Sequence, residues 1–350
     1  MSANPPNLPN PPNLPNSPHP SNSPPLPVNS AARSRLNRSQ TGAIAGLLIV
    51  TAIWGATFVV VKDATARLPV FDFLMWRFGI AGVLMAILRP QALRRMDRGV
   101  AGRGAAIGLL LGLAYITQTM GLQTTSAAVS GFLTGLFVVF TPLLTCLLFR
   151  TRLRPLVWVA VVIAASGLAL MTLNGVAFGS GELLTLLCAV CFALHIVALG
   201  RWSPGRDPYA LTVIQMATVS AMCFVGALLQ GPGLRSPGGG SEWTAVLITA
   251  VLASAFAYMV QTWAQAHVTP TQAAVVLTME PVFAGISAVV FGGESLTMST
   301  VAGGGLVVAA MYLIELSGTS SGEATPEEAS VGTATTVPDA EARGPTAGVQ

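Results

Sequence analysis

The sequence predicts an all-α membrane protein in which ten transmembrane helices form two inverted five-helix repeats. Three observations lead to this fold class: a low content of charged residues, ten long apolar runs, and a register that aligns the second half of the chain with the first. Of the 350 residues, 52% are hydrophobic and 9% are charged, whereas an average soluble domain is about 25% charged. The composition therefore predicts a chain embedded in the lipid bilayer.

The two ends of the chain are predicted to be disordered cytoplasmic tails. Residues 1–41 form the first tail, and residues 1–30 alone contain 11 Pro and 7 Asn. Such a composition offers too little apolar surface to build a core. The tail has no apolar h-region of a signal peptide, so the first span is expected to direct membrane insertion. Residues 317–350 are rich in Gly, Ser, Thr and Ala and mildly acidic, and they form the second tail.

Between the tails lie the apolar runs that predict the ten helices. A helix needs roughly 20 residues to cross a hydrocarbon core of about 30 Å. The runs do not alternate between apolar and polar residues, which favours helices over the strands of a closed barrel. Their approximate limits are 42–62, 70–88, 104–122, 126–149, 155–173, 180–199, 209–230, 243–265, 271–292 and 298–316.

The basic residues between the runs predict the orientation in the membrane. With a cytoplasmic N-terminus, the inner segments carry thirteen arginines, whereas the outer loops hold only Lys62, Arg67 and Arg235. Basic residues concentrate on the cytoplasmic side of membrane proteins. The sequence therefore predicts a multi-pass protein of the inner or plasma membrane with both termini in the cytoplasm. The net charge of +4 arises from these loop arginines, so no nucleic-acid partner is expected.

An internal repeat appears when the chain is shifted by 143 residues. The segment ITQTMGLQTTSAAVSGFLTGLFVVF (116–140) then aligns with MVQTWAQAHVTPTQAAVVLTMEPVF (259–283), and Gln118 falls on Gln261. The predicted units are 42–173 and 174–316, with five spans each. Because five is odd, the second unit must be inverted relative to the first. Inverted repeats are typical of secondary transporters, whose substrate site lies near the midplane between the repeats.

Four segments resemble one known transporter family. They are WGATFVVVK (54–62), WRF (76–78), QTTSAAVSGFLTGL (123–136) and LTMEPVFAGISAVVFGGESLT (277–297). Together they resemble the EamA family of the drug/metabolite transporter superfamily, over about 42–316. The resemblance implies a ten-helix inner-membrane carrier, often an exporter of amino acids or other small metabolites.

Two pairs of residues are the most specific marks of this resemblance. They are Glu280–Pro281 in the ninth predicted span and Gly293–Glu294 after it. The first half departs from the pattern, because Thr151 stands at the position that corresponds to Glu294.

Glu280 is the first candidate for a functional residue inside the membrane. It lies about 14 Å from the inner edge of its predicted span, near the midplane. Pro281 lacks an N–H group and leaves the carbonyl group near Leu277 without its helical partner. Because burial disfavours a charged carboxylate, we expect a proton site or a substrate site here. The alternative is an acid that pairs with a neighbouring helix for assembly.

Arg77 is the second candidate, about 10 Å from the outer edge of its span. A charge at this depth costs roughly 2.5–3.5 kcal/mol on insertion scales. We expect its guanidinium group to pair with Glu280 or with a substrate carboxylate. The alternative is that the side chain extends to the outer interface, which it is long enough to reach.

Further polar and aromatic residues inside the predicted spans complete the candidate pathway. Gln118 and Gln261 occupy the same frame of the repeat, although hydrogen bonds between helices would explain each of them alone. His195 could carry protons or could be a hydrogen-bonded structural residue. The full candidate set is Glu280, Arg77, Gln118, Gln261, Trp54, Tyr115, His195 and Gln215, with Pro281 as the helix break.

The sequence as a whole predicts a secondary active transporter of small metabolites, such as amino acids or drug-like compounds. Export by alternating access is expected. Proton coupling is expected because the chain has no Walker A motif for ATP. The alternatives are a channel or receptor-like protein and an intramembrane enzyme. No HExxH motif is present, and the nearest serine motif, AASG (164–167), has no suitably placed His, so an enzyme, a cofactor and a metal site are not expected. The expected partners are a small-molecule substrate and the bilayer, with a homodimer left open.

Overall fold

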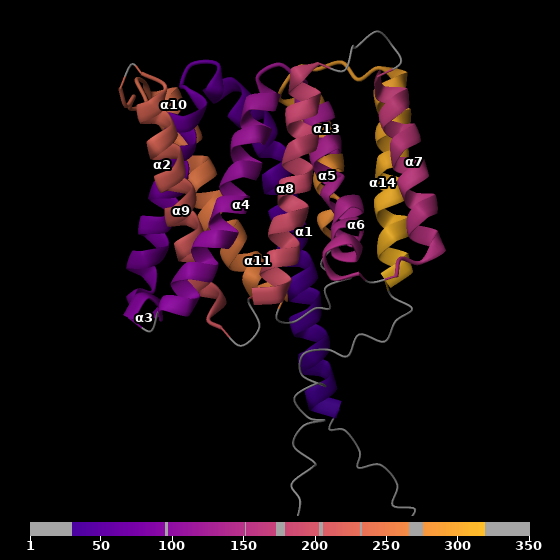
Figure 1. Ribbon diagram of the computed structural model, residues 1–350, viewed down its shortest axis with the longest axis horizontal. Coiled ribbons are helices and arrows are strands. Elements are labelled where there is room, and N and C mark those ends of the chain that lie inside the picture. Colours follow the sequence, from indigo (N-terminus) through magenta and orange to yellow (C-terminus); the bar gives the residue numbers. More distant parts are fainter. Residues whose placement is uncertain are drawn as a thin grey trace, which may run out of the picture. The chain divides into compact units, whose positions relative to one another are not determined.

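The computed structural model describes residues 30–94, 97–150, 152–172, 179–202, 206–231, 233–265 and 276–318. The chain divides into two compact units, Met1–Arg38 and Ser39–Gln350, and the core and the candidate site belong to the second. All regular structure in the described residues is helical (Figure 1). Helix α1 (Ser30–Thr65) begins inside the predicted N-terminal tail. The rest of that tail, 1–29, and residues 319–350 of the predicted C-terminal tail lie outside the described part.

The first half of the body contains six further helices. Asp97 caps α4 by accepting a hydrogen bond from the Val100 N–H at 2.6 Å. Ser126 caps α5 in the same way through the Val129 N–H at 3.1 Å. Side-chain oxygens at these positions satisfy N–H groups that have no partner inside the helix. The helices are α2 (Val70–Leu88), α3 (Pro90–Arg94), α4 (Arg98–Leu122), α5 (Ala127–Gly135), α6 (Phe137–Phe149) and α7 (Pro155–Thr172).

The second half contains a π-helical segment, η1 (Thr249–Phe256), between two α-helices. Asp207 caps α9 through the Tyr209 N–H at 3.0 Å, and Pro208 occupies the first turn, where its missing N–H costs nothing. The remaining elements are α8 (Ser180–Trp202), α9 (Pro208–Leu229), α10 (Gly240–Ile248), α11 (Ala257–Gln265), α13 (Glu280–Val290) and α14 (Met298–Gly318).

Seven of the described helical segments are long and apolar enough to cross a membrane. Three shorter apolar helices, 155–170, 280–290 and 298–313, complete the apolar part of the described chain. The prediction of a multi-pass, all-helical membrane protein is therefore confirmed. The ten predicted runs correspond to these seven segments and three shorter helices.

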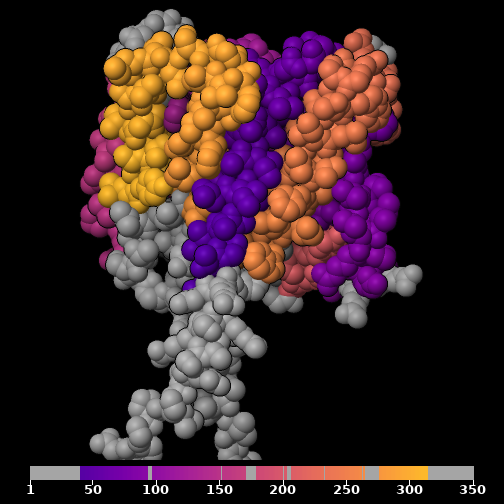
Figure 2. Space-filling model, turned by 180° about the vertical axis from the view of Figure 1, so that it is seen from behind, coloured from indigo at the N-terminus to yellow at the C-terminus, as the bar shows by residue number. Residues whose placement is uncertain are grey.

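The helices pack in pairs that join distant parts of the sequence. In Figure 1, α7 lies along α14, and α4 lies beside α8. Helix α2 packs on α9, and α5 packs on α13. On the opposite face, α1 lies between the segment formed by α10, η1 and α11 and the segment formed by α13 and α14 (Figure 2). The first half of the chain is thus interleaved with the second.

Candidate functional site

The Arg77 side chain lies at the centre of the bundle and is 3% exposed. Its Nε–H donates a hydrogen bond to Ser254 Oγ of η1 at 3.0 Å. Its guanidinium carbon lies 5.1 Å from the ring centre of Phe78 and 4.9 Å from that of Tyr115, within the range of cation–π attraction. Among the described residues, the Nη1 and Nη2 groups have no hydrogen-bond partner and no anion within 4.0 Å. Four N–H donors of a buried cation are therefore left for another group.

Two tyrosines meet next to this arginine. The hydroxyl oxygens of Tyr115 on α4 and Tyr258 on α11 are 3.1 Å apart, and both residues are buried. The two positions are separated by 143 residues, which is the shift that aligns the two halves of the sequence. A residue that touches its own repeat counterpart lies where the two halves meet. We call Arg77, Tyr115, Ser254 and Tyr258 the central cluster.

The π-helical segment positions two groups at the central cluster. Its residue Ser254 accepts the Arg77 hydrogen bond, and the Ala253 carbonyl accepts one from Trp54 Nε1 at 2.8 Å. The Trp54 ring lies 5.6 Å from the Tyr258 ring. Single π-helical turns inside α-helices are frequent at functional sites because they re-aim side chains. Here the segment joins α1 and α2 of the first half to the eighth predicted span.

Glu280 stands at a helix break, as the sequence predicts. Residues 278–279 form a turn, and α13 begins at Glu280 with Pro281 in its first turn. In the first half, α6 begins at Phe137, which is 143 residues before Glu280. Both halves therefore break their helix at the same place, but only the second half supplies an acid there.

The Glu280 carboxylate forms no ion pair or hydrogen bond among the described residues. It is surrounded by protein but retains part of its accessible surface. Its charge and that of Arg77 both act electrostatically on the Tyr115 hydroxyl. The direct Arg77–Glu280 pairing that the sequence allowed is not found among the described residues, and the Arg77 Nε–H group donates to Ser254 instead. An arginine and an acid from different halves of the chain are thus near enough to the tyrosine pair to act on it electrostatically, without an ion pair between them.

Among the other predicted candidates, three form hydrogen bonds with other side chains. Gln118 donates to Thr134 Oγ1 of α5 at 3.2 Å. His195 Nε2 lies 2.8 Å from Gln215 Oε1, and both side chains are buried. This pair joins α8 to α9 as a structural contact between helices. Gln261 is half-buried on α11.

Two functional candidates, Tyr258 and Ser254, were missed in the sequence. The repeat register contains a signal for Tyr258, because it is the counterpart of Tyr115 at the shift that relates Gln118 to Gln261. Ser254 carries no comparable signal, since only the fold brings it to Arg77.

The hydrogen bond between the two tyrosines predicts that substitutions of them have coupled effects on stability. Tyr115→Phe and Tyr258→Phe each remove the same hydrogen bond, so each should destabilise the protein by about 0.5–1.5 kcal/mol. The double variant should be no less stable than either single variant, because the bond is lost only once. Thermal unfolding of the four purified proteins measures this. Additive losses would mean that the two hydroxyl groups act independently.

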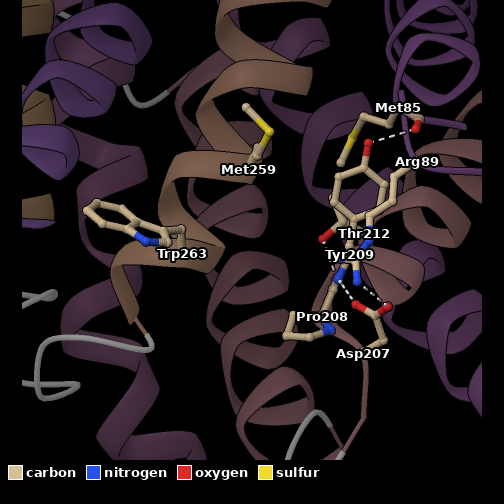
Figure 3. Close-up of a pocket in the computed structure, with 8 residues that line it drawn as sticks. All are labelled: Met85, Arg89, Asp207, Pro208, Tyr209, Thr212, Met259 and Trp263. Atoms are coloured by element: carbon tan, nitrogen blue, oxygen red, sulfur yellow. Dashed lines mark hydrogen bonds and ion pairs between the residues drawn. The ribbon is translucent and has the colours of Figure 1, made fainter. Parts of the chain in front are cut away.

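A cavity of about 250 Å³ lies nearer the end of the bundle predicted to be cytoplasmic. Arg89 and Tyr209 border one side of it, and Met259 and Trp263 of α11 border the other (Figure 3). Arg89 lies 3.5 Å from Asp207, and the Tyr209 hydroxyl donates to the Met85 carbonyl at 2.7 Å. Its remaining lining residues are Met85, Asp207, Pro208 and Thr212. The cavity is mostly apolar and has a polar rim.

Comparison with protein families gives two matches in this chain. The EamA-like transporter family matches residues 41–173 and again residues 179–316.

Several curated proteins are similar over most of the chain. An uncharacterized transporter of Archaeoglobus fulgidus is 30% identical over 272 residues, which cover 77% of this chain and 85% of that protein. The uncharacterized inner membrane transporter YedA of Escherichia coli K12 is 26% identical over 288 residues, covering 79% and 90%. The threonine/homoserine exporter RhtA of the same strain is 29% identical over 180 residues, covering 49% and 58%. These named relatives are transporters rather than enzymes.

The fold also matches a solved crystal structure. The TM-score is 0.59 at 20% identity, and the match covers 79% of this chain and 97% of the other. At this identity the likeness concerns the fold alone.

Proposed function

Because the chain belongs to the EamA-like transporter family, we propose that it is a proton-coupled secondary carrier that exports small metabolites bearing a carboxylate group. Amino acids are the foremost class. The similarity to a protein named as a threonine/homoserine exporter supports this choice. The central cluster supplies the chemistry that such a substrate needs, and alternating access moves the substrate past it.

The single observation that carries the proposal is the Arg77 guanidinium group. A cation inside the membrane is costly and is generally retained for a functional reason. Two aromatic rings and Ser254 hold the group in place, while its Nη1 and Nη2 groups have no partner among the described residues. A guanidinium edge with paired N–H donors matches the two oxygens of a carboxylate. Arg77 is therefore the substrate's carboxylate-binding residue.

The carrier architecture consists of two inverted five-helix repeats, with ten spans and both termini in the cytoplasm. The two family matches support the repeats, and the helix breaks at Phe137 and Glu280 support their equivalence. Five spans in each repeat require the second to be inverted. In such carriers broken helices meet at the substrate site near the midplane. Glu280 at its break is the group that binds the coupling proton.

The inner cavity is the route by which the substrate reaches Arg77. Met85 at its border follows Arg77 by eight residues on α2, a distance of about 12 Å along a helix axis. The apolar walls suit the substrate's carbon skeleton, and Arg89 at the rim suits its carboxylate. The cavity thus supports a path from the cytoplasm to the central cluster.

Transport by purified protein in liposomes tests the proposal. An imposed proton gradient should drive saturable movement of one or more amino acids. An analogue whose carboxylate is replaced by an amide should compete poorly. Saturation distinguishes a carrier from a channel, in which flux rises in proportion to concentration. Absence of flux for every carboxylate-bearing metabolite in the panel would overturn the proposal.

A further inference from the structure

Glu294 joins the two halves of the chain at the end of the bundle that the basic residues assign to the cell exterior, which we call the outer end. Its Oε1 accepts a hydrogen bond from the Ala127 N–H at 2.7 Å, and its Oε2 accepts one from the Ala128 N–H at 3.2 Å. These are the first two N–H groups of α5, which have no partner within their own helix. A carboxylate is stabilised there by hydrogen bonding and by the helix dipole.

Lys62 ties a third segment to the same carboxylate. Its Nζ lies 3.3 Å from Glu294 Oε1 and donates to the Thr125 carbonyl at 2.9 Å. Gly293 places Glu294 in this position with a φ of 63°, a backbone conformation that favours glycine. The end of α1, the start of α5 and the turn after α13 are thus held together. We propose that Glu294, positioned by Lys62 and the start of α5, closes the outer gate of the transport path.

The helices beneath this contact pack closely against one another. A side-chain carbon added at Gly131 of α5 would lie 2.4 Å from the Ala284 Cβ of α13. One added at Gly55 of α1 would lie 2.6 Å from the Phe283 Cβ. Three helices from both halves therefore meet with their backbones in close approach. Separating the outer ends of α5 and α13 would open this contact to the exterior.

The Ser130 hydroxyl indicates that this contact is one that opens. It is fully buried beside Gly131 and has no hydrogen-bond partner in the described part of the chain. A buried polar group without a partner is unusual and calls for an explanation. If α5 moves away from α13, water reaches this hydroxyl group and satisfies it. The closed gate keeps Ser130 dry, and the open gate hydrates it.

The repeat makes the gate asymmetric. The residue 143 positions before Glu294 is Thr151, so the first half has no carboxylate at the corresponding inner position. In an inverted-repeat carrier the inner gate is the counterpart of the outer one. The carboxylate of Glu294 at the outer end therefore has no counterpart at the equivalent position of the first half. This inference rests on the proposed carrier function, and the contacts of Glu294 correspond to the closed state of the outer gate.

A cysteine at position 130 reports on the gate directly. In a parent whose four native cysteines are replaced by alanine, Ser130→Cys should react slowly with a membrane-impermeant maleimide added outside right-side-out vesicles. Glu294→Gln should raise this rate about tenfold or more, since hydrogen bonds to a charged group are lost. Lys62→Met should raise it less, because the hydrogen bonds from α5 remain. Glu294→Asp should restore part of the protection.

The control is Glu242→Gln, which removes a partly exposed acid in the first turn of α10. It should leave the labelling rate unchanged. An unchanged rate in both Glu294→Gln and Lys62→Met, with normal thermal unfolding, would overturn the gate. Faster labelling only in inside-out vesicles would place the gate at the other end and would also overturn it. Because labelling requires no substrate, a gate that responds in a protein without transport would refute the carrier function alone.

Discussion

Replacing Arg77 by glutamine is expected to raise the KM for carboxylate-bearing substrates about tenfold to a hundredfold. Hydrogen bonds to charged groups contribute about 1.5–3 kcal/mol, and each 1.4 kcal/mol is about tenfold in affinity. Glutamine keeps one amide donor but loses the charge and the paired donors. It also loses the attraction to the rings of Phe78 and Tyr115. Initial rates of uptake into liposomes, measured over a range of substrate concentrations, give the change.

Two comparisons separate carboxylate recognition from a loss of structure. Arg77→Lys retains a positive charge but not the planar guanidinium group, so its KM should lie between those of the parent and the glutamine variant. Arg67→Gln removes an exposed arginine whose ion pair among the described residues is with Asp63 in the preceding turn, and it should leave transport unchanged. If Arg77→Gln weakens transport of a carboxylate and of its amide analogue equally, Arg77 does not bind the carboxylate.

Much of the framework could be predicted from the sequence, because apolar length and charge distribution are local properties. The ten apolar runs correspond to the seven long segments and three short helices of the described chain. The shift of 143 residues likewise anticipates where Tyr115 meets Tyr258 and where both halves break their helices. A repeat that preserves spacing also preserves the contacts that depend on spacing.

The partners of individual side chains could not be predicted, because they depend on distant elements. Nothing near Arg77 in the sequence points to Ser254, which reaches it only through a π-helical segment. His195 and Gln215 were candidates for the pathway as separate polar residues, but the fold joins them to each other. In the sequence, Glu294 was a mark of the family resemblance with no assigned role. In the structure, its carboxylate binds the start of α5 and Lys62, both from the first half of the chain. The sequence pattern identifies which polar residues lie in the membrane spans, whereas the packing of the helices determines which groups each of them contacts.

Glu280→Gln is expected to abolish the dependence of transport on the proton gradient while leaving substrate exchange intact. Among the described residues, Glu280 is the acid that lies with Arg77 around the tyrosine pair. Glutamine has nearly the same shape but cannot take up or release a proton. The broken helix at Pro281 does not depend on the charge, so the variant should still fold. Substrate accumulation against its gradient should then fail at every imposed pH difference, whereas exchange of labelled for unlabelled substrate should continue.

The separation of exchange from accumulation is the decisive part of this test, because a general loss of activity would fit many causes. Exchange requires the substrate site and the gates, but no net movement of protons. Glu280→Asp keeps a titratable group one carbon shorter and should retain some proton-driven transport. Glu242→Gln, at a partly exposed acid in the first turn of α10, should behave as the parent does. If Glu280→Gln still accumulates substrate when the proton gradient is imposed, the coupling proton binds elsewhere. The acid of the second half would then have a structural role, as its neighbour Pro281 does.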